Sequence, residues 1–177
     1  IGTGCTAQDG STLVGKLLRL DSAGNPAPGN PFLNDPLVDD RIYGFGLREP
    51  LRIAFDHATG ALYVADVGDD SREEISVVPA GSPPPNFGWR VLEGSLCAST
   101  LECTAFPCPS PQFVPPAFEY DSSGGCFAVI GGAVYRGNQI PELGGQYLFA
   151  DWCTSQLFGL RWVEQRTKAR RDLYLSS

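Results

Sequence analysis

A short acidic segment offers the densest set of side chains that could bind a cation. Five carboxylates fall close together, at Asp66, Asp69, Asp70, Glu73 and Glu74. Carboxylate oxygens are good ligands for Ca²⁺, but this spacing does not follow the EF-hand pattern. Asp66-Val-Gly is also a common way to end a strand. The pattern favours a solvated turn over a calcium site built from side chains.

Residues for nucleophilic or metal chemistry are otherwise scarce. The sequence has one histidine, His57, which we expect to be exposed in a hairpin turn and to have no catalytic role. No glycine-rich phosphate loop, nucleophile elbow or metal-binding histidine cluster is present. The sequence therefore indicates no catalytic residue within this segment.

The six cysteines favour disulfides. None forms a C-x-x-C pair, and a zinc site would have few ligands to use. Cys97, Cys103 and Cys108 lie in one loop rich in Pro, Ser and Thr, where internal or flanking bridges could hold it together; the connectivity stays open. Disulfides are typical of an oxidising compartment, so we expect a secreted, extracellular protein.

Charge and hydropathy exclude several classes of partner. The net charge is -7 and the sequence pI about 4.6, which argues against nucleic acid and anionic membranes. The basic run 166–171 is predicted to be a solvated tail. No apolar run has the length of a membrane span. The chain opens on Ile1 and has no methionine, so we expect it to be part of a longer protein.

Many short strands joined by tight turns are the predicted structure. Glycine (21) and proline (15) are scattered between short apolar runs, and no segment keeps a helical period over several turns. Gly60 is placed to close a hairpin in the left-handed conformation. The fold class is all-β, with strands expected at 15–21, 42–46, 52–56, 61–66, 74–78, 127–136, 147–151 and 156–161.

An internal repeat favours a propeller. Residues 60–67 align with 145–152 at an offset of 85 positions. A blade has four strands in about 40–50 residues, so the offset fits two blades, or one blade with a long insertion. Two similar hairpins in a sandwich are the alternative. Asp66 and Asp151 recur in the repeat, which indicates a shared structural role such as accepting turn amides.

Several motifs carry a resemblance that runs from about residue 15 to residue 160. They are Ile42-Tyr-Gly-Phe-Gly-Leu-Arg-Glu-Pro50, Asn86-Phe-Gly-Trp-Arg-Val-Leu-Glu-Gly94, Gly131-Gly-Ala-Val-Tyr-Arg-Gly137 and Asp151-Trp-Cys153. In this order they resemble the glucose/sorbosone dehydrogenase family, and the added cysteines resemble its hedgehog-interacting-protein-like branch. The resemblance implies that 1–177 is a segment of one six-bladed β-propeller domain. It would supply about three to four blades of antiparallel strands and a Cys/Pro-rich loop insertion at about 95–117.

The resemblance also implies a cofactor site. Family enzymes oxidise sugars with pyrroloquinoline quinone (PQQ) and Ca²⁺. Arg48 matches an arginine that reaches the quinone carbonyls, and Arg136 takes the place of a cofactor-binding lysine. Gly68 and Asp69 match positions whose backbone carbonyls hold the calcium. The family's general-base histidine would lie upstream of Ile1.

Two departures from the family pattern bear on function. Glu49 replaces an asparagine beside Arg48, and the residues at 154–156, where the family has a basic pair, are uncharged. We therefore expect an extracellular binding or scaffold module that recognises a protein partner, with the remainder of the propeller outside this chain. The alternatives are a PQQ-dependent aldose dehydrogenase with a sugar substrate, and a structural subunit of an extracellular assembly. Trp89 and Trp152 are expected to pack in the core.

Overall fold

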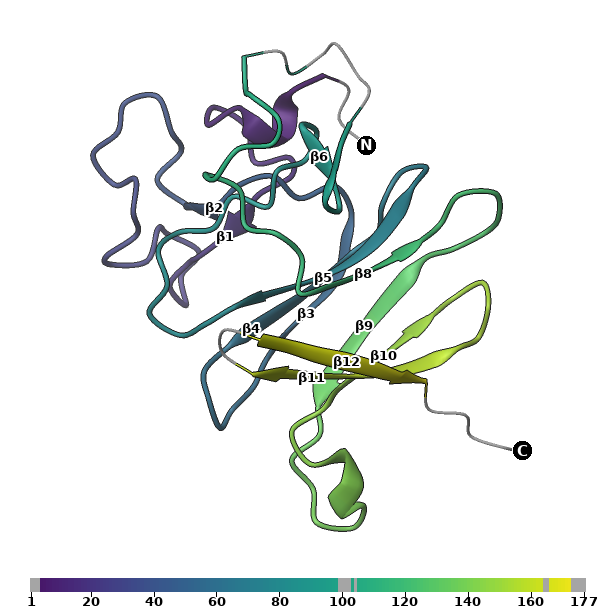
Figure 1. Ribbon diagram of the computed structural model, residues 1–177. Coiled ribbons are helices and arrows are strands. Elements are labelled where there is room, and N and C mark those ends of the chain that lie inside the picture. Colours follow the sequence, from purple (N-terminus) through teal and green to yellow (C-terminus); the bar gives the residue numbers. More distant parts are fainter. Residues whose placement is uncertain (1–3, 99–102, 104, 164–165, 173–177) are drawn as a thin grey trace. The chain divides into compact units, whose positions relative to one another are not determined.

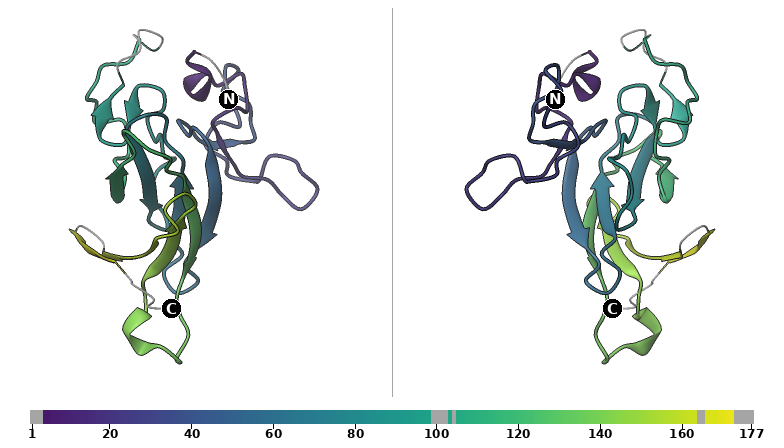
Figure 2. Two further views of the ribbon diagram at one scale, coloured as in Figure 1. Left: turned by 90° about the vertical axis from the view of Figure 1, so that its right-hand side faces the viewer. Right: turned by 90° about the vertical axis from the view of Figure 1, so that its left-hand side faces the viewer.

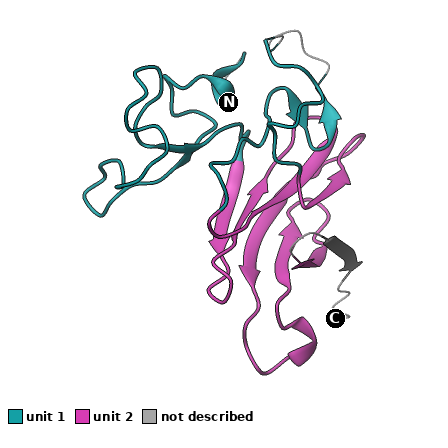
Figure 3. Ribbon diagram, turned by 60° about the vertical axis from the view of Figure 1, so that its left-hand side comes forward, with its two compact units in different colours: residues 1–49, 82–115 teal, residues 50–81, 116–177 magenta. Residues whose placement is uncertain are grey.

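The computed structural model describes residues 4–98, 103, 105–163 and 166–172 (Figure 1). The chain divides into two compact units (Figure 3). Unit 1 comprises residues 1–49 and 82–115, and unit 2 comprises residues 50–81 and 116–177. Strands are the main regular elements of both units, and the described helices are the short 3-10 turns η1 (Thr6–Gln8) and η3 (Pro141–Leu143). The all-β prediction is confirmed.

Unit 2 contains two four-stranded antiparallel sheets. The first has the order β3-β4-β5-β8, built from β3 (Pro50–Phe55), β4 (Leu62–Asp66), β5 (Arg72–Val78) and β8 (Phe118–Asp121). The second has the order β12-β11-β10-β9, built from β9 (Val129–Val134), β10 (Tyr147–Asp151), β11 (Leu157–Val163) and β12 (Arg166–Asp172). Each sheet has the strand number and the neighbour order of a propeller blade.

The internal repeat marks equivalent strands of these two sheets. The offset of 85 carries β4 onto β10 and β5 onto β11, which are the second and third strands of their sheets. Residues 79–117, which include the cysteine-rich loop, separate β5 from β8. Of the two propeller interpretations, the structure thus shows one blade with a long insertion.

The core of unit 2 lies between the two sheets, which pack against each other (Figure 2). Side chains alternate across a strand, so every second residue of β4, β5, β10 and β11 enters this layer. The Tyr63 and Tyr147 rings stack with centroids 4.6 Å apart, and those of Phe149 and Phe158 are 5.1 Å apart. The buried members are Ala61, Tyr63, Ala65, Ile75, Val77, Val129, Tyr147, Phe149, Phe158 and Leu160.

A glycine pair in β9 allows the strands to approach. A Cβ at Gly131 would lie 2.8 Å from the Arg52 Cβ and 2.9 Å from the Ala65 Cβ. A Cβ at Gly132 would collide with the Leu148 carbonyl oxygen on the neighbouring strand. A side chain at either position would push β9 away from its neighbours, which explains two consecutive glycines inside a strand.

Unit 1 has less regular structure. Its two-stranded sheets are β1–β2 (Leu17–Leu18 and Ile42–Gly44) and β6–β7 (Leu92–Glu93 and Leu96–Cys97). Two disulfides, Cys5–Cys103 and Cys97–Cys108, lie in this unit, and Cys126–Cys153 lies in unit 2. The predicted disulfides are confirmed, and they supply cross-links where the sheets are small.

Two sequence predictions are wrong. Residues 166–171 belong to β12, which pairs with the edge of β11. An outer blade strand is held by backbone hydrogen bonds to its neighbour, so it forms without an alternating apolar pattern. Trp152 is 74% exposed, since it follows β10 in a turn, outside the alternation that fills the core. Trp89, at 9%, is buried as predicted, and His57 is exposed. Within the described ranges no helix has the length and apolarity to cross a membrane.

Candidate functional site

Arg48, in unit 1, is held against an aromatic ring and beside an acid. Its guanidinium carbon lies 5.5 Å from the centre of the Trp89 ring, a cation–π distance. Its Nη1 lies 3.4 Å from a carboxylate oxygen of Glu49. The Arg48 side chain is 12% exposed and that of Glu49 is 48% exposed. The arginine singled out by sequence is therefore already engaged by protein groups.

The motif that begins at Asn86 positions Arg48. The Asn86 and Gln8 amides exchange hydrogen bonds of 2.8 and 3.0 Å, and Gln8 Nε2 also donates to the Trp89 carbonyl. The Trp89 amide donates to the Gly46 carbonyl (2.9 Å). A Cβ at Gly46, where φ is +81°, would lie 2.5 Å from the Asn86 Oδ1, so only glycine fits this left-handed turn before Arg48. The family motif thus sets the place of Trp89 under the guanidinium.

Gly68 and Asp69, in unit 2, lie in the turn that follows β4. Gly68 is buried and Asp69 is exposed. The acidic residues around them separate, because Asp66 and Glu73 are buried whereas Asp70 is exposed. The described residues contain no group of three or more acidic, His or Cys side chains arranged to hold a metal. A calcium held by the backbone carbonyls of Gly68 and Asp69 stays a prediction.

Glu73 has a structural role that the sequence did not suggest. Its side chain is 1% exposed, and its Oε2 accepts the amide of Val129, the first residue of β9, at 2.8 Å. This contact joins the first sheet of unit 2 to the second. A buried carboxylate needs such partners, so Glu73 serves the packing of the sheets and is not presented to a ligand.

Arg136 forms a close ion pair with Asp56 in unit 2. Its Nε donates to Asp56 Oδ1 (2.9 Å) and its Nη2 to Asp56 Oδ2 (2.6 Å), a bidentate geometry. The Arg136 side chain hydrogen bonds hold the pKa of Asp56 well below its usual range. Asp56 starts the hairpin before β4, whereas Gly68 follows β4, so Arg136 and the predicted calcium ligands lie at opposite ends of that strand. The structure does not bring Arg136 together with Gly68 and Asp69.

Asp151 is a further buried carboxylate of unit 2, at 1% exposure. Its Oδ2 accepts the Tyr120 hydroxyl (2.6 Å) and the Ala128 amide (2.9 Å), and its Oδ1 accepts the amides of Cys153 and Thr154. The predicted turn-capping role of Asp151 is confirmed. Tyr120 was not anticipated, since nothing in the residues around it indicates a partner 31 positions away.

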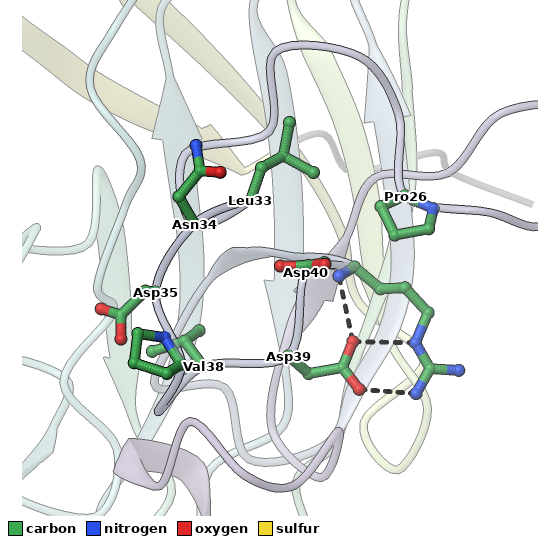
Figure 4. Close-up of a pocket in the computed structure, with 9 residues that line it drawn as sticks. Pro26, Leu33, Asn34, Asp35, Val38, Asp39 and Asp40 are labelled. Carbon is green, nitrogen blue, oxygen red and sulfur yellow. Dashed lines mark hydrogen bonds and ion pairs between the residues drawn. The ribbon is translucent and has the colours of Figure 1, made fainter.

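A pocket of about 570 Å³ lies among the loops of unit 1 (Figure 4). Asp35, Asp39 and Asp40 line it, with Pro26 and Leu33 on other parts of its wall. The Arg41 side chain forks onto the Asp39 carboxylate at 2.8 and 2.6 Å, and this contact lowers the pKa of Asp39 to about 2. The Asp39 carboxylate of this pocket is thus neutralised by the Arg41 guanidinium.

One described feature does not suit the polyanionic quinone that the family resemblance implies: the Glu49 carboxylate lies 3.4 Å from the Arg48 guanidinium. Such a cofactor needs guanidinium or ammonium groups directed at it. Arg48 stacks on Trp89 in unit 1, and in unit 2 Arg136 binds Asp56 through Nε and Nη2. Quinone binding by these two arginines stays a prediction.

Comparison with known proteins identifies the relatives. The chain matches the family described as glucose/sorbosone dehydrogenase over residues 2–176. It is 32% identical to the HIPL1 protein of Arabidopsis thaliana over 169 residues, which cover 82% of this chain and 24% of the relative.

Two solved structures share its fold. The apo form of the soluble aldose sugar dehydrogenase of Escherichia coli has a TM-score of 0.76 and 23% identity, covering 98% of this chain and 48% of that one. The PQQ-bound aldose sugar dehydrogenase of Streptomyces coelicolor has a TM-score of 0.69 and 22% identity, covering 97% of this chain and 42% of that one. The predicted partial β-propeller is thereby confirmed. The chain spans between about a quarter and about half the length of these proteins and belongs to the glucose/sorbosone dehydrogenase family, on the branch that includes the HIPL1 protein.

Proposed function

We propose that this chain is part of an extracellular propeller that acts as a binding or scaffold module and not as a quinone-dependent enzyme. The observation that carries the proposal is the Glu49 carboxylate, 3.4 Å from the Arg48 guanidinium. A negative charge beside the one arginine at the motif position opposes a polyanionic cofactor, because like charges repel and the acid competes for the guanidinium.

The three disulfides support an extracellular location, since such bonds form and persist in oxidising compartments. An apolar row on β3 supports packing against further protein. Leu51, Ile53 and Phe55 lie at alternate positions of this strand and are 54%, 48% and 58% exposed. We assign all 177 residues to one propeller domain. Either the rest of that domain or a partner chain would cover these three side chains.

A sugar dehydrogenase is the second candidate. The E. coli and S. coelicolor relatives are named aldose sugar dehydrogenases, and the latter was solved with PQQ. Calcium held by the Gly68 and Asp69 carbonyls would belong to this alternative. The third candidate is a structural subunit of an extracellular assembly, in which another chain covers the exposed apolar side chains of β3.

A spectroscopic titration with PQQ and Ca²⁺, followed by an aldose, separates these functions. The natural full-length protein is compared with Glu49→Asn and with a matched control, Glu142→Gln, an exposed acid in η3. Under our proposal the wild type shows no saturable quinone binding at about 10 µM, roughly 7 kcal/mol of binding free energy, and no sugar-dependent reduction. Tight binding by the wild type with reduction of the quinone on addition of aldose would establish the dehydrogenase instead. Quinone binding gained by Glu49→Asn, but not by Glu142→Gln, would show that Glu49 is what opposes the cofactor.

A further inference from the structure

Unit 2 has a second, mixed polar and aromatic pocket at the hairpin end of its sheets. Its volume is about 350 Å³, within the range of about 300–1,000 Å³ typical of small-molecule sites. The residues that matter for its chemistry are Asp56, Thr59, Tyr63, Arg136, Gly145 and Trp162. They lie before β4 or near its start, before β10, or toward the end of β11, so the pocket is distant along β4 from Gly68 and Asp69, which follow that strand.

The carboxylate of this pocket has no capacity left for a ligand. Asp56 Oδ1 accepts hydrogen bonds from Arg136 Nε and from the Ala58 amide (3.2 Å). Its Oδ2 accepts from Arg136 Nη2 and from the Thr59 hydroxyl (2.6 Å). Two bonds to each oxygen use the usual acceptor sites of a carboxylate. Asp56 therefore neutralises Arg136 and fixes the plane of its guanidinium group. No acceptor site of Asp56 is left for a ligand.

Hydrogen-bond donors, in contrast, are left over. Arg136 Nη1 and Arg161 Nη1 each lie 3.4 Å from the position that a Cβ would take at Gly145. Within the part of the chain that the structure describes, Arg136 Nη1 and the whole Arg161 guanidinium make no hydrogen bond or ion pair. Asp56 and Arg136 are the charged residues that line the pocket, and their charges balance. Arg161 is not among the lining residues but adds a positive charge beside Gly145, so the described rim carries surplus N–H donors next to a residue without a side chain.

The walls add aromatic surface with polar tips. Tyr63 and Trp162 lie on the inward faces of β4 and β11 and continue the core layer to its open end. Burial raises the pKa of Tyr63, so its hydroxyl stays protonated. Neither the Tyr63 hydroxyl nor the Trp162 indole N–H forms a hydrogen bond within the described residues. Such groups bind a ligand that is apolar on one face and rich in acceptors at its edges.

We propose that this pocket binds a carboxylated pyranose, that is, a uronic acid residue. The pyranose ring packs on the half-buried Trp162 indole, because the Tyr63 ring is 2% exposed and already stacks on Tyr147. Its hydroxyls meet the Tyr63 and Trp162 polar groups, and its carboxylate lies at the Arg136–Arg161 rim. The carboxylate is the feature that the geometry selects, because Asp56 is already satisfied as an acceptor whereas Arg136 Nη1 and the Arg161 guanidinium make no hydrogen bond within the described residues. The pocket lies at the opposite end of β4 from Gly68 and Asp69, the predicted calcium ligands.

Isothermal titration calorimetry of the natural full-length protein tests this proposal, with sodium D-glucuronate, D-glucose and sodium sulfate as the probes. We expect saturable glucuronate binding with a Kd of about 1 mM or below, roughly 4 kcal/mol, at least about tenfold tighter than glucose. A tenfold ratio corresponds to about 1.4 kcal/mol, the lower part of the range for hydrogen bonds to a charged group. Sulfate at the same concentration should not displace glucuronate.

The matched variants are Arg161→Gln and Arg19→Gln. Both remove one exposed arginine charge, and Arg19 lies in unit 1. Arg161→Gln should weaken glucuronate binding at least about fivefold, whereas Arg19→Gln should leave it unchanged. Trp162→Phe, which keeps an aromatic wall but removes the indole N–H, should weaken glucuronate and glucose alike. Equal affinity for glucose and glucuronate, displacement by sulfate, or an unchanged Kd in Arg161→Gln would each overturn the proposal.

Discussion

Replacing Arg136 with methionine is the most direct test of how the hairpin before β4 is held. The change keeps the aliphatic stem and removes both hydrogen bonds to Asp56, whose side chain is 1% exposed. Removing one partner of a fully buried ion pair costs about 3–5 kcal/mol. Here the Arg136 side chain is 43% exposed, and Asp56 keeps its bonds from Thr59 and Ala58. Because water reaches the pair from one side, we expect a loss of about 2 kcal/mol of unfolding free energy at pH 7.

The pH dependence gives a second signature. The side-chain hydrogen bonds from Arg136 lower the pKa of Asp56 in the folded state. A carboxyl with a lowered folded pKa adds stability above its unfolded pKa of about 3.9, and this stability is lost as the pH falls toward the folded value. The Arg136→Met variant loses most of that contribution. The difference in unfolding free energy between wild type and variant should therefore be full above about pH 5 and shrink below about pH 3.

Urea unfolding of the natural full-length protein at pH 7 and pH 3 measures both effects. The variants are Arg136→Met, Asp56→Asn and the double substitution, with Arg19→Met as a charge-matched control outside unit 2. We expect the double variant to be less destabilised than the sum of the single ones, because each single substitution leaves a buried partner unpaired. A cost below about 0.5 kcal/mol at pH 7, within the range of ordinary surface substitutions, would refute the reasoning. So would an equal cost at both pH values.

Three further predictions concern other parts of the chain. Asp151→Ala should lower the unfolding free energy by about 2–4 kcal/mol in urea titrations, because five described donors lose a buried acceptor; a change below about 1 kcal/mol would contradict the turn-capping role. Replacing both Cys126 and Cys153 by serine should lower the unfolding free energy by about 2–4 kcal/mol, since the disulfide closes a loop with a separation of 27 residues. The replacement should also remove the sensitivity of unit 2 unfolding to reductant. Burial lowers the pKa of Lys16 to about 8, so the unfolded chain binds more protons between pH 8 and about 10.5 and stability should rise across that window. A Lys16→Met variant should lack this rise when unfolding is followed at several pH values, and an identical profile would show that Lys16 is not the titrating group.

The parts of the fold that follow from local pattern were predictable. The repeat at 60–67 and 145–152 correctly indicated equivalent strands, because the same alternation and the same terminal aspartate recur wherever a blade's second strand turns. Gly60 adopts a φ of +73°, as the hairpin required. The outer strands β8 and β12 were missed, since such strands are defined by pairing with a neighbour and carry no strong alternation of their own.

The candidate site was harder to predict, because resemblance assigns a residue to a motif position and not to a place in space. The Arg48 guanidinium stacks on Trp89, which belongs to a different motif, 86–94. Arg136 keeps the charge expected at its position, yet its direction is set by Asp56, 80 residues earlier in the sequence. Nothing in either segment alone indicates that pairing, which arises only when the two sheets of unit 2 pack together.

The same argument explains why the uronate pocket has no signature in the sequence. Its acid, its aromatic wall and its two arginines come from β-hairpins far apart along the chain, and each has an ordinary alternative role in a blade. Within the described residues the acceptor sites of Asp56 are filled, whereas Arg136 Nη1 and the Arg161 guanidinium make no hydrogen bond. This surplus of donors is what makes the set specific. A site with surplus donors and no surplus acceptor selects an anion, and the aromatic wall selects a flat, partly apolar one. Ligand selectivity here follows from which groups the fold has already satisfied, which is a property of packing and not of any single motif.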